Sequence, residues 1–113
     1  MFEGVPTMYM YLLNCPDLEQ YDLSSLTRCT VGGQTMPVSK MQEVEARFGC
    51  PLLELWGMTE IAGLGTTHPF YGVNRHGSIG IGLPYVETRI AATEDASKSL
   101  NQGAIAVPGF TST

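Results

Sequence analysis

The segment Glu54–Glu60, with the sequence ELWGMTE, combines residue types that could together hold a nucleotide. Trp56 offers an indole that could stack on a base, and Gly57 offers flexible backbone that suits a turn. The Thr59 hydroxyl could reach a phosphate oxygen, and the Glu60 carboxylate could hold a hard cation such as Mg²⁺. Taken alone, these residues favour a simpler interpretation, in which the tryptophan is a core residue and the glutamate a solvated charge.

A second glycine-rich turn strengthens the nucleotide hypothesis. Gly32 and Gly33 follow the β-type run 26–31, and a helical segment follows them. The next strand is expected at 51–56, so the order strand, helix, strand predicts a parallel pair with a right-handed crossover. Both glycine-rich turns then lie at the carboxyl ends of their strands, where open α/β sheets bind ligands. The exposed N–H groups at the start of the intervening helix favour negative charge there.

Two helices are expected in the first half of the chain. Segment 5–16 has Pro6 in its first turn and Pro16 at its end, and Val5, Met8 and Leu12 recur at helical spacing. Segment 36–51 is the clearer helix, because Gly49 and Pro51 are typical stop signals. Its expected capping box is Ser39 with Gln42. Its expected buried stripe consists of Val38, Met41, Val44 and Phe48.

The second half changes character, because glycine becomes frequent after residue 56 and helix formers become scarce. Short strands are expected within 63–68, 78–83 and 86–93. The fold class is therefore α/β: a partial parallel sheet with a βαβ unit, in the order helix, strand, helix, strand, followed by a glycine-rich part with short β-strands. We divide the chain into an α/β half, 1–56, and a glycine-rich half, 57–113.

Composition excludes several classes of protein. The net charge of -5 leaves no basic surface for nucleic acid. No run reaches the ~18 apolar residues of a membrane span, and the start of the chain does not resemble a signal peptide. Cys15, Cys29 and Cys50 show no metal-ligand spacing, and we interpret them as reduced, packed thiols of a cytoplasmic protein.

The combination of motifs resembles the adenylate-forming superfamily, particularly its acyl-CoA synthetases. The motifs are GVPTMY at 4–9, GGQTMP at 32–37, LLELWGMTE at 52–60 and HGSIGIGLPYVETRI at 76–90, in the family's order and spacing. The resemblance covers residues ~4 to ~92 and implies an internal fragment of the family's large N-terminal domain. It implies ATP, Mg²⁺ and CoA as cofactors of the parent protein and a carboxylic acid as its substrate.

The resemblance also implies roles for individual residues. Gly32, Gly33 and Gln34 would form the loop on one side of adenine, and Glu54 and Leu55 would belong to the same binding segment. Trp56 would place its ring against adenine. Gly57 and Met58 would bring backbone close to the acyl-adenylate. Thr59 would contact the phosphate, and Glu60 would coordinate Mg²⁺.

Several elements of the family have no counterpart in this chain. They are the upstream phosphate loop ending in Lys, the downstream Thr-Gly-Asp element and the C-terminal domain with its catalytic Lys. The segment GLGTTHP, 63–69, has the composition of the phosphate loop but follows the Thr-Glu motif and lacks the Lys, so we treat it as a chance likeness. Arg75 is interpreted as a surface residue, with a substrate-carboxylate contact as the alternative.

We therefore expect a fragment of an ATP-dependent acyl-CoA synthetase for fatty acids, cytoplasmic, with a peripheral membrane location of the parent left open. The alternatives are an aryl- or amino-acid-activating adenylation domain, and a non-catalytic α/β binding module. The isolated chain is expected to be inactive and to self-associate, because strand edges and apolar faces would lack their partners.

Overall fold

The computed structural model describes residues 1–91, 95, 97–98 and 104–106, the last three by their backbone only. The elements of the first half are β1 (Phe2–Gly4), α1 (Pro6–Leu13), a 3-10 turn (Leu18–Gln20), β2 (Cys29–Gly32), α2 (Val38–Phe48) and β3 (Leu52–Met58). Those of the second half are a 3-10 turn (Thr59–Ile61), β4 (Gly63–Thr67), β5 (Ile81–Gly82), β6 (Arg89–Ala91) and β7 (Ala104–Ala106).

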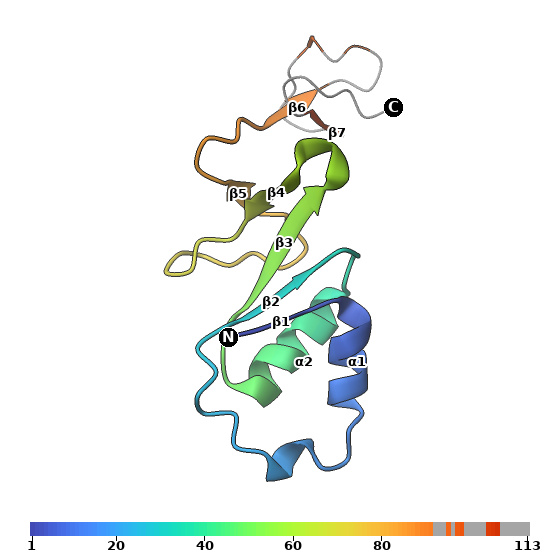
Figure 1. Ribbon diagram of the computed structural model, residues 1–113, viewed down its shortest axis with the longest axis vertical. Coiled ribbons are helices and arrows are strands. Elements are labelled where there is room, and N and C mark those ends of the chain that lie inside the picture. Colours follow the sequence, from blue (N-terminus) through green and yellow to red (C-terminus); the bar gives the residue numbers. More distant parts are fainter. Residues whose placement is uncertain (92–94, 96, 99–103, 107–113) are drawn as a thin grey trace.

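The strands β1 to β5 form one sheet in sequence order, and β6 pairs with β7 in a second sheet. The pairs β1–β2 and β2–β3 are parallel, whereas β4 and β5 are antiparallel additions. Figure 1 shows α1 and α2 beside the parallel part, with β4 and β5 near the far end of β3. This arrangement confirms the α/β class, the βαβ unit and the glycine-rich part with short strands. It also adds β1, which we did not expect.

The core lies between the two helices and one face of the parallel strands. It includes Cys29, Val31 and Leu52 from the sheet, and Tyr9 lies fully buried against them. The Tyr9 hydroxyl donates a 2.7 Å hydrogen bond to the Thr30 carbonyl, and the same burial raises the pKa of its phenol. The first helix is thus attached to the second strand by both packing and a buried hydrogen bond.

The buried face of α1 differs from the expected one. Pro6, Tyr9 and Leu13 are buried, whereas Val5 and Met8 are 43% and 45% exposed. The expected stripe was wrong at Val5 and Met8, because apolar character alone was used to place the face, whereas Leu12 is half-buried and packs against the core as expected. The tyrosine ring has more surface to bury, and its hydroxyl finds an acceptor in the sheet.

The second helix matches its expected bounds more closely. Met41, Val44 and Phe48 are buried as expected, and Gly49 follows the helix in the left-handed conformation, with φ of 69°. The capping box was wrong, because the helix begins at Val38 and no side chain caps it. Val38 is also 41% exposed rather than part of the buried stripe.

Strand β3 continues two residues beyond its expected end at Trp56. Gly57 lies inside the strand, opposite Leu64 of β4. A Cβ on Gly57 would collide with the carbonyl oxygen of Gly63, so this glycine permits close strand approach instead of making a turn. The turn comes later, at Thr59–Ile61.

Two further expectations concern cysteines and membrane spans. All three cysteines are free thiols, and the Sγ atoms of buried Cys29 and Cys50 are 3.6 Å apart. Among the residues that the structure describes, no helix has the length and apolar character needed to cross a membrane.

Candidate nucleotide and acyl site

The carboxyl ends of β2 and β3 meet where the sequence placed its two glycine-rich motifs. Gly32 and Leu55 are register partners, and a Cβ on Gly32 would lie 2.9 Å from the Leu55 carbonyl oxygen. This approach is closer than real Cβ contacts allow, so glycine keeps the two strand ends together. Gly33 continues the turn with φ of +83°, a conformation that favours glycine.

A cavity of about 550 Å³ opens at this edge of the sheet. It is lined by Glu3, Gly4, Val5, Met8, Gly32, Gly33, Leu55, Gly57, Met58, Thr59, Gly63 and Leu64. Six of the ten candidate site residues are therefore in its wall: Gly32, Gly33, Leu55, Gly57, Met58 and Thr59. The glycines leave backbone groups accessible, the larger apolar residues form the sides, and Glu3 supplies a carboxylate. Such a mixture suits a ligand with both a polar and an apolar part.

The remaining four candidates lie outside the cavity wall. Gln34 and Glu60 are exposed. Glu54 and Trp56 alternate along β3 with Leu55 and Gly57, so their side chains emerge on the opposite face. The Trp56 ring packs there against β4, because a Cβ on Gly65 would lie 3.1 Å from it.

Glu54 has an unusual electrostatic setting on that opposite face. Its Oε2 atom is buried without a hydrogen-bond partner among the described residues. Burial raises the pKa of the Glu54 carboxyl, and the neighbouring charges of His68 and His76 oppose the rise. Its main-chain carbonyl is bound by the Thr67 hydroxyl at 3.0 Å. The Glu54 side chain therefore holds a buried carboxylate oxygen without a hydrogen-bond partner among the described residues, on the sheet face opposite the cavity.

Thr59 and Glu60 begin the 3-10 turn that follows β3, and both are exposed. The Glu60 carboxylate has no hydrogen-bond or ion-pair partner among the described residues. In the part of the chain that the structure describes, no cluster of three or more His, Cys, Asp or Glu could hold a metal alone. One free carboxylate does fit Mg²⁺ bound jointly with substrate phosphates and water, the usual arrangement for this ion in nucleotide sites.

Sequence reasoning missed several lining residues. Glu3 and Gly4 come from β1, which was not expected, and Val5 and Met8 were assigned to the buried face of a helix. Gly63 and Leu64 belong to the segment 63–69 that we had set aside as a chance likeness. The antiparallel pairing of Met58 with Gly63 brings this segment back to the cavity. Arg75 is exposed and does not line it.

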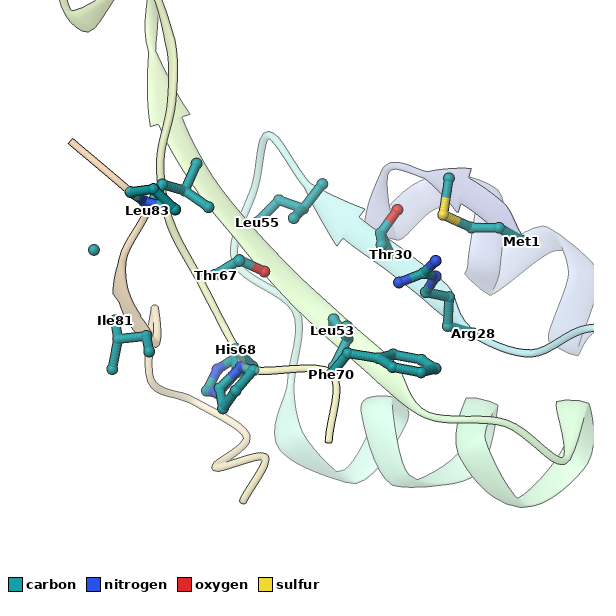
Figure 2. A pocket seen from close by; sticks show the side chains of 13 residues that line it. Met1, Arg28, Thr30, Leu53, Leu55, Thr67, His68, Phe70, Ile81 and Leu83 are labelled. Atoms are coloured by element: carbon teal, nitrogen blue, oxygen red, sulfur yellow. The ribbon is translucent and has the colours of Figure 1, made fainter. Parts of the chain in front are cut away.

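A second cavity, of about 400 Å³, lies along the sheet face that α1 and α2 do not cover. Figure 2 shows Leu53 and Leu55 of β3 along its floor, with Ile81 and Leu83 on one side and Arg28 beside Phe70 on the other. The Arg28 guanidinium lies 4.5 Å from the centre of the Phe70 ring. Leu55 lines both cavities, so the two cavities adjoin at this residue.

Comparison with known proteins identifies the family to which this chain belongs. The model of the AMP-binding enzyme family matches residues 1–110, so the chain belongs to that family. It is 34% identical over 111 residues to the long-chain-fatty-acid–CoA ligase of Bacillus subtilis, which covers 96% of this chain. Family membership confirms the resemblance to adenylate-forming enzymes, and the curated relatives are CoA ligases, which join an acid to a thiol.

Solved structures agree in fold as well as in sequence. ATP-bound MatB from Rhodopseudomonas palustris superposes with a TM-score of 0.84 and 32% identity, over 95% of this chain and 22% of that one. The anthranilate CoA ligase AuaEII in complex with anthranoyl-AMP gives a TM-score of 0.81 and 25% identity, over 94% of this chain and 20% of that one. The ATP and acyl-AMP in these structures accord with a nucleotide-using family.

The chain spans only 15% to 20% of the length of the first curated relatives that it matches. The family and the fold therefore follow from the comparisons, whereas the activity of a whole protein is a separate question.

Proposed function

We propose that this chain is an internal part of the large N-terminal domain of an ATP-dependent acyl-CoA synthetase that acts on fatty acids in the cytoplasm. One observation carries the proposal: the parallel register of β2 and β3 joins the Gly32–Gly33 turn and the segment 55–59 around one cavity. Ligands of open α/β sheets bind at this edge. In this account the chain comprises an α/β part, 1–56, and a glycine-rich part, 57–113, of the same domain.

The proposed reaction has two steps. The substrate carboxylate attacks the α-phosphorus of ATP, forms an acyl–AMP anhydride and releases pyrophosphate. The thiolate of CoA then attacks the acyl carbon and displaces AMP. Because the substrates supply both nucleophiles, the protein must position them and stabilise the charge that develops on the phosphoryl group.

Each residue has a proposed task in that chemistry. Gly32, Gly33 and Gln34 border adenine. For Trp56 to stack on adenine as the resemblance implies, its ring must leave the opposite face of β3, where it packs beside Gly65. Backbone at Gly57 and Met58 approaches the acyl-adenylate. The Thr59 hydroxyl donates to a phosphate oxygen. The Glu60 carboxylate holds Mg²⁺, which neutralises phosphate charge when it is bound.

The choice of a fatty acid rests on the second cavity. An acyl chain that starts beside Leu55 would continue along Leu53, between the apolar side chains of Ile81 and Leu83. This path is mainly apolar and open, which favours a flexible hydrocarbon over a short charged acid.

The experiment is an acid panel offered to the full-length protein with ATP and Mg²⁺, scored by acid-dependent pyrophosphate release and by mass detection of acyl-AMP. We expect turnover with long-chain fatty acids and much less with benzoate-type acids or amino acids. Preference for an aromatic acid would favour the aryl-activating alternative, for which the second cavity would hold a ring. Absence of acyl-AMP with every acid would favour the non-catalytic binding module.

A further inference from the structure

The connection 68–80, which leads from β4 to β5, is held by a set of side-chain hydrogen bonds outside the candidate site. Glu45 of α2 is at their centre. Its Oε1 accepts the backbone N–H of Leu52 at 2.8 Å, and its Oε2 is 2.9 Å from His76 Nε2. Asn74 donates to the Leu52 carbonyl at 2.8 Å and approaches Glu45 Oε1 at 3.5 Å. We call Glu45, Asn74 and His76 the clasp.

The clasp occupies an edge of β3 that β4 does not reach. Pairing between the two strands begins at Leu55 and Thr67, so Leu52 faces no strand on that side. Side chains from a helix and a loop bind both backbone groups of Leu52 instead. They satisfy the N–H and carbonyl groups of Leu52, which would otherwise be unpaired at an open edge of the sheet.

Further contacts fix the course of the connection. The backbone N–H of Arg75 donates to His68 Nδ1 at 3.4 Å, so His68 Nε2 carries the proton that it donates to the Ser78 carbonyl at 2.7 Å. Gly77 passes beside α2, where a Cβ would lie 3.2 Å from Val38. Gly80 then turns with φ of +83°, directly against the Thr67 carbonyl.

The position of this connection determines one wall of the second cavity. The connection leads into Ile81 and Gly82, which pair with β4 at only two positions. Leu83 follows, and its N–H donates to the Gly65 carbonyl at 2.9 Å. These residues line the cavity in Figure 2. So short a strand pairing is weak alone. The Thr66 hydroxyl, which donates to the Ile79 carbonyl at 2.6 Å, anchors the end of the connection, and the clasp anchors its middle.

We infer that Glu45 is a positioning residue for the acid substrate: through His76 and Asn74 it holds connection 68–80 against β3 and thereby sets the wall at Ile81–Leu83. This inference rests on the proposed function, because it takes the second cavity as the acyl path. Glu45 itself touches neither cavity.

The test uses the full-length protein with Glu45→Gln and His76→Gln, and with Glu43→Gln as matched control. Gln at 45 can still accept from Leu52 but removes the charge that holds His76. The control removes a carboxylate from the same helix, but one paired only with Lys40 at 2.6 Å. The first readout is hydrogen exchange of a peptide that covers Leu83. The second is steady-state kinetics with a long-chain acid.

We expect Glu45→Gln and His76→Gln to speed exchange around Leu83 by about threefold to tenfold, as when a partly buried hydrogen bond to a charged group is lost. The KM for the acid should rise by a similar factor, while kcat and the KM for ATP stay within about twofold. A generally loosened structure would instead change all three constants. Exchange and acid KM equal to those of Glu43→Gln would overturn the inference.

Two outcomes, a variant that does not fold and a wild-type protein without activity, are interpreted as follows. If Glu45→Gln does not fold, His76→Gln decides, because Glu45 then keeps its bonds to Leu52 and Asn74. If the wild-type protein activates no acid, the proposed function fails and with it the substrate-positioning role. The exchange comparison then still tests whether the clasp holds the wall.

Discussion

Gly32 and Leu55 are register partners at the carboxyl ends of two parallel strands, and the missing Cβ of Gly32 is what lets the Leu55 carbonyl lie so close. This pairing links two motifs that are separated in sequence by a whole helix. It also sets the shape of the cavity, since both residues line it. The proposed function depends on this pairing of the two strand ends.

The first prediction concerns Gly32→Ala. The new methyl group must displace the backbone at Leu55, which we expect to cost about 1–3 kcal/mol of unfolding free energy. It should also weaken nucleotide binding by the full-length protein, measured by calorimetry. Gly49→Ala is the control: it strains a left-handed residue at the distant end of α2 but has no neighbour within 4 Å. If both variants bind ATP equally well, the close approach does not shape the site.

The second prediction concerns Tyr85→Gly. Tyr85 is fully exposed and adopts φ of 67°, the left-handed region that costs a non-glycine residue about 1–2 kcal/mol. Glycine removes this strain but loses more chain entropy on folding, so we expect a net gain of up to about 1 kcal/mol in urea unfolding. Tyr71→Gly, at an exposed residue without positive φ, should bring no gain. Equal effects at the two positions would contradict the strain argument.

The third prediction is a pH dependence at Glu54. Burial raises its pKa in the folded state, so folding favours the protonated carboxyl. The contribution of the Glu54 carboxyl to the free energy of unfolding is fully present below the usual glutamate pKa of about 4.3. It is lost as the pH rises through the pKa of the folded state. Glu54→Gln should therefore become more stable relative to wild type as the pH rises from 4 to about 8. Urea titrations across that range, with exposed Glu87→Gln as control, measure the difference; a difference independent of pH would refute it.

The fourth prediction concerns the 113-residue chain alone. It should form no acyl-AMP, because it holds only part of the site that must position ATP and acid. It should also self-associate. Among the described residues β1 is an edge strand with one partner, and the sheet face with Leu53 and Leu55 is not the face on which α1 and α2 pack. A monomer by light scattering at tens of micromolar, or acyl-AMP made by this chain, would contradict the prediction.

The helices and strands were largely predictable, because Gly49, the prolines and the apolar runs act locally. The rotation of α1 was not, since it depends on the Tyr9 hydroxyl reaching Thr30 across the fold. The capping box failed for a similar reason: spacing between Ser39 and Gln42 does not determine where the first turn begins. A tertiary contact decided the first case, and the start of α2 at Val38 decided the second.

The candidate site was predictable in its backbone and less so in its side chains. Parallel pairing brings the ends of β2 and β3 together whatever their sequence. Gly32 and Gly57 could therefore be predicted to lie at the same edge of the sheet. The shared face of Glu54 and Trp56 follows from alternation along β3. The continuation of β3 through Gly57 was not predicted, because this glycine was expected in a turn. Gly63 and Leu64 reach the cavity wall through the antiparallel pairing of β3 with β4. No short motif in the sequence specifies that pairing.

The most direct test of the central claim is acid-dependent ATP–pyrophosphate exchange by the full-length protein and its Glu60→Gln variant. Glu60 is exposed and has no hydrogen-bond or ion-pair partner among the described residues, so the substitution should leave thermal unfolding unchanged. We predict that exchange falls by about 10²–10³, the usual cost of losing one group that stabilises transition-state charge. Glu87→Gln should exchange at the wild-type rate. Wild-type exchange in Glu60→Gln would remove Glu60 from the site of adenylate formation and contradict its proposed role in holding Mg²⁺.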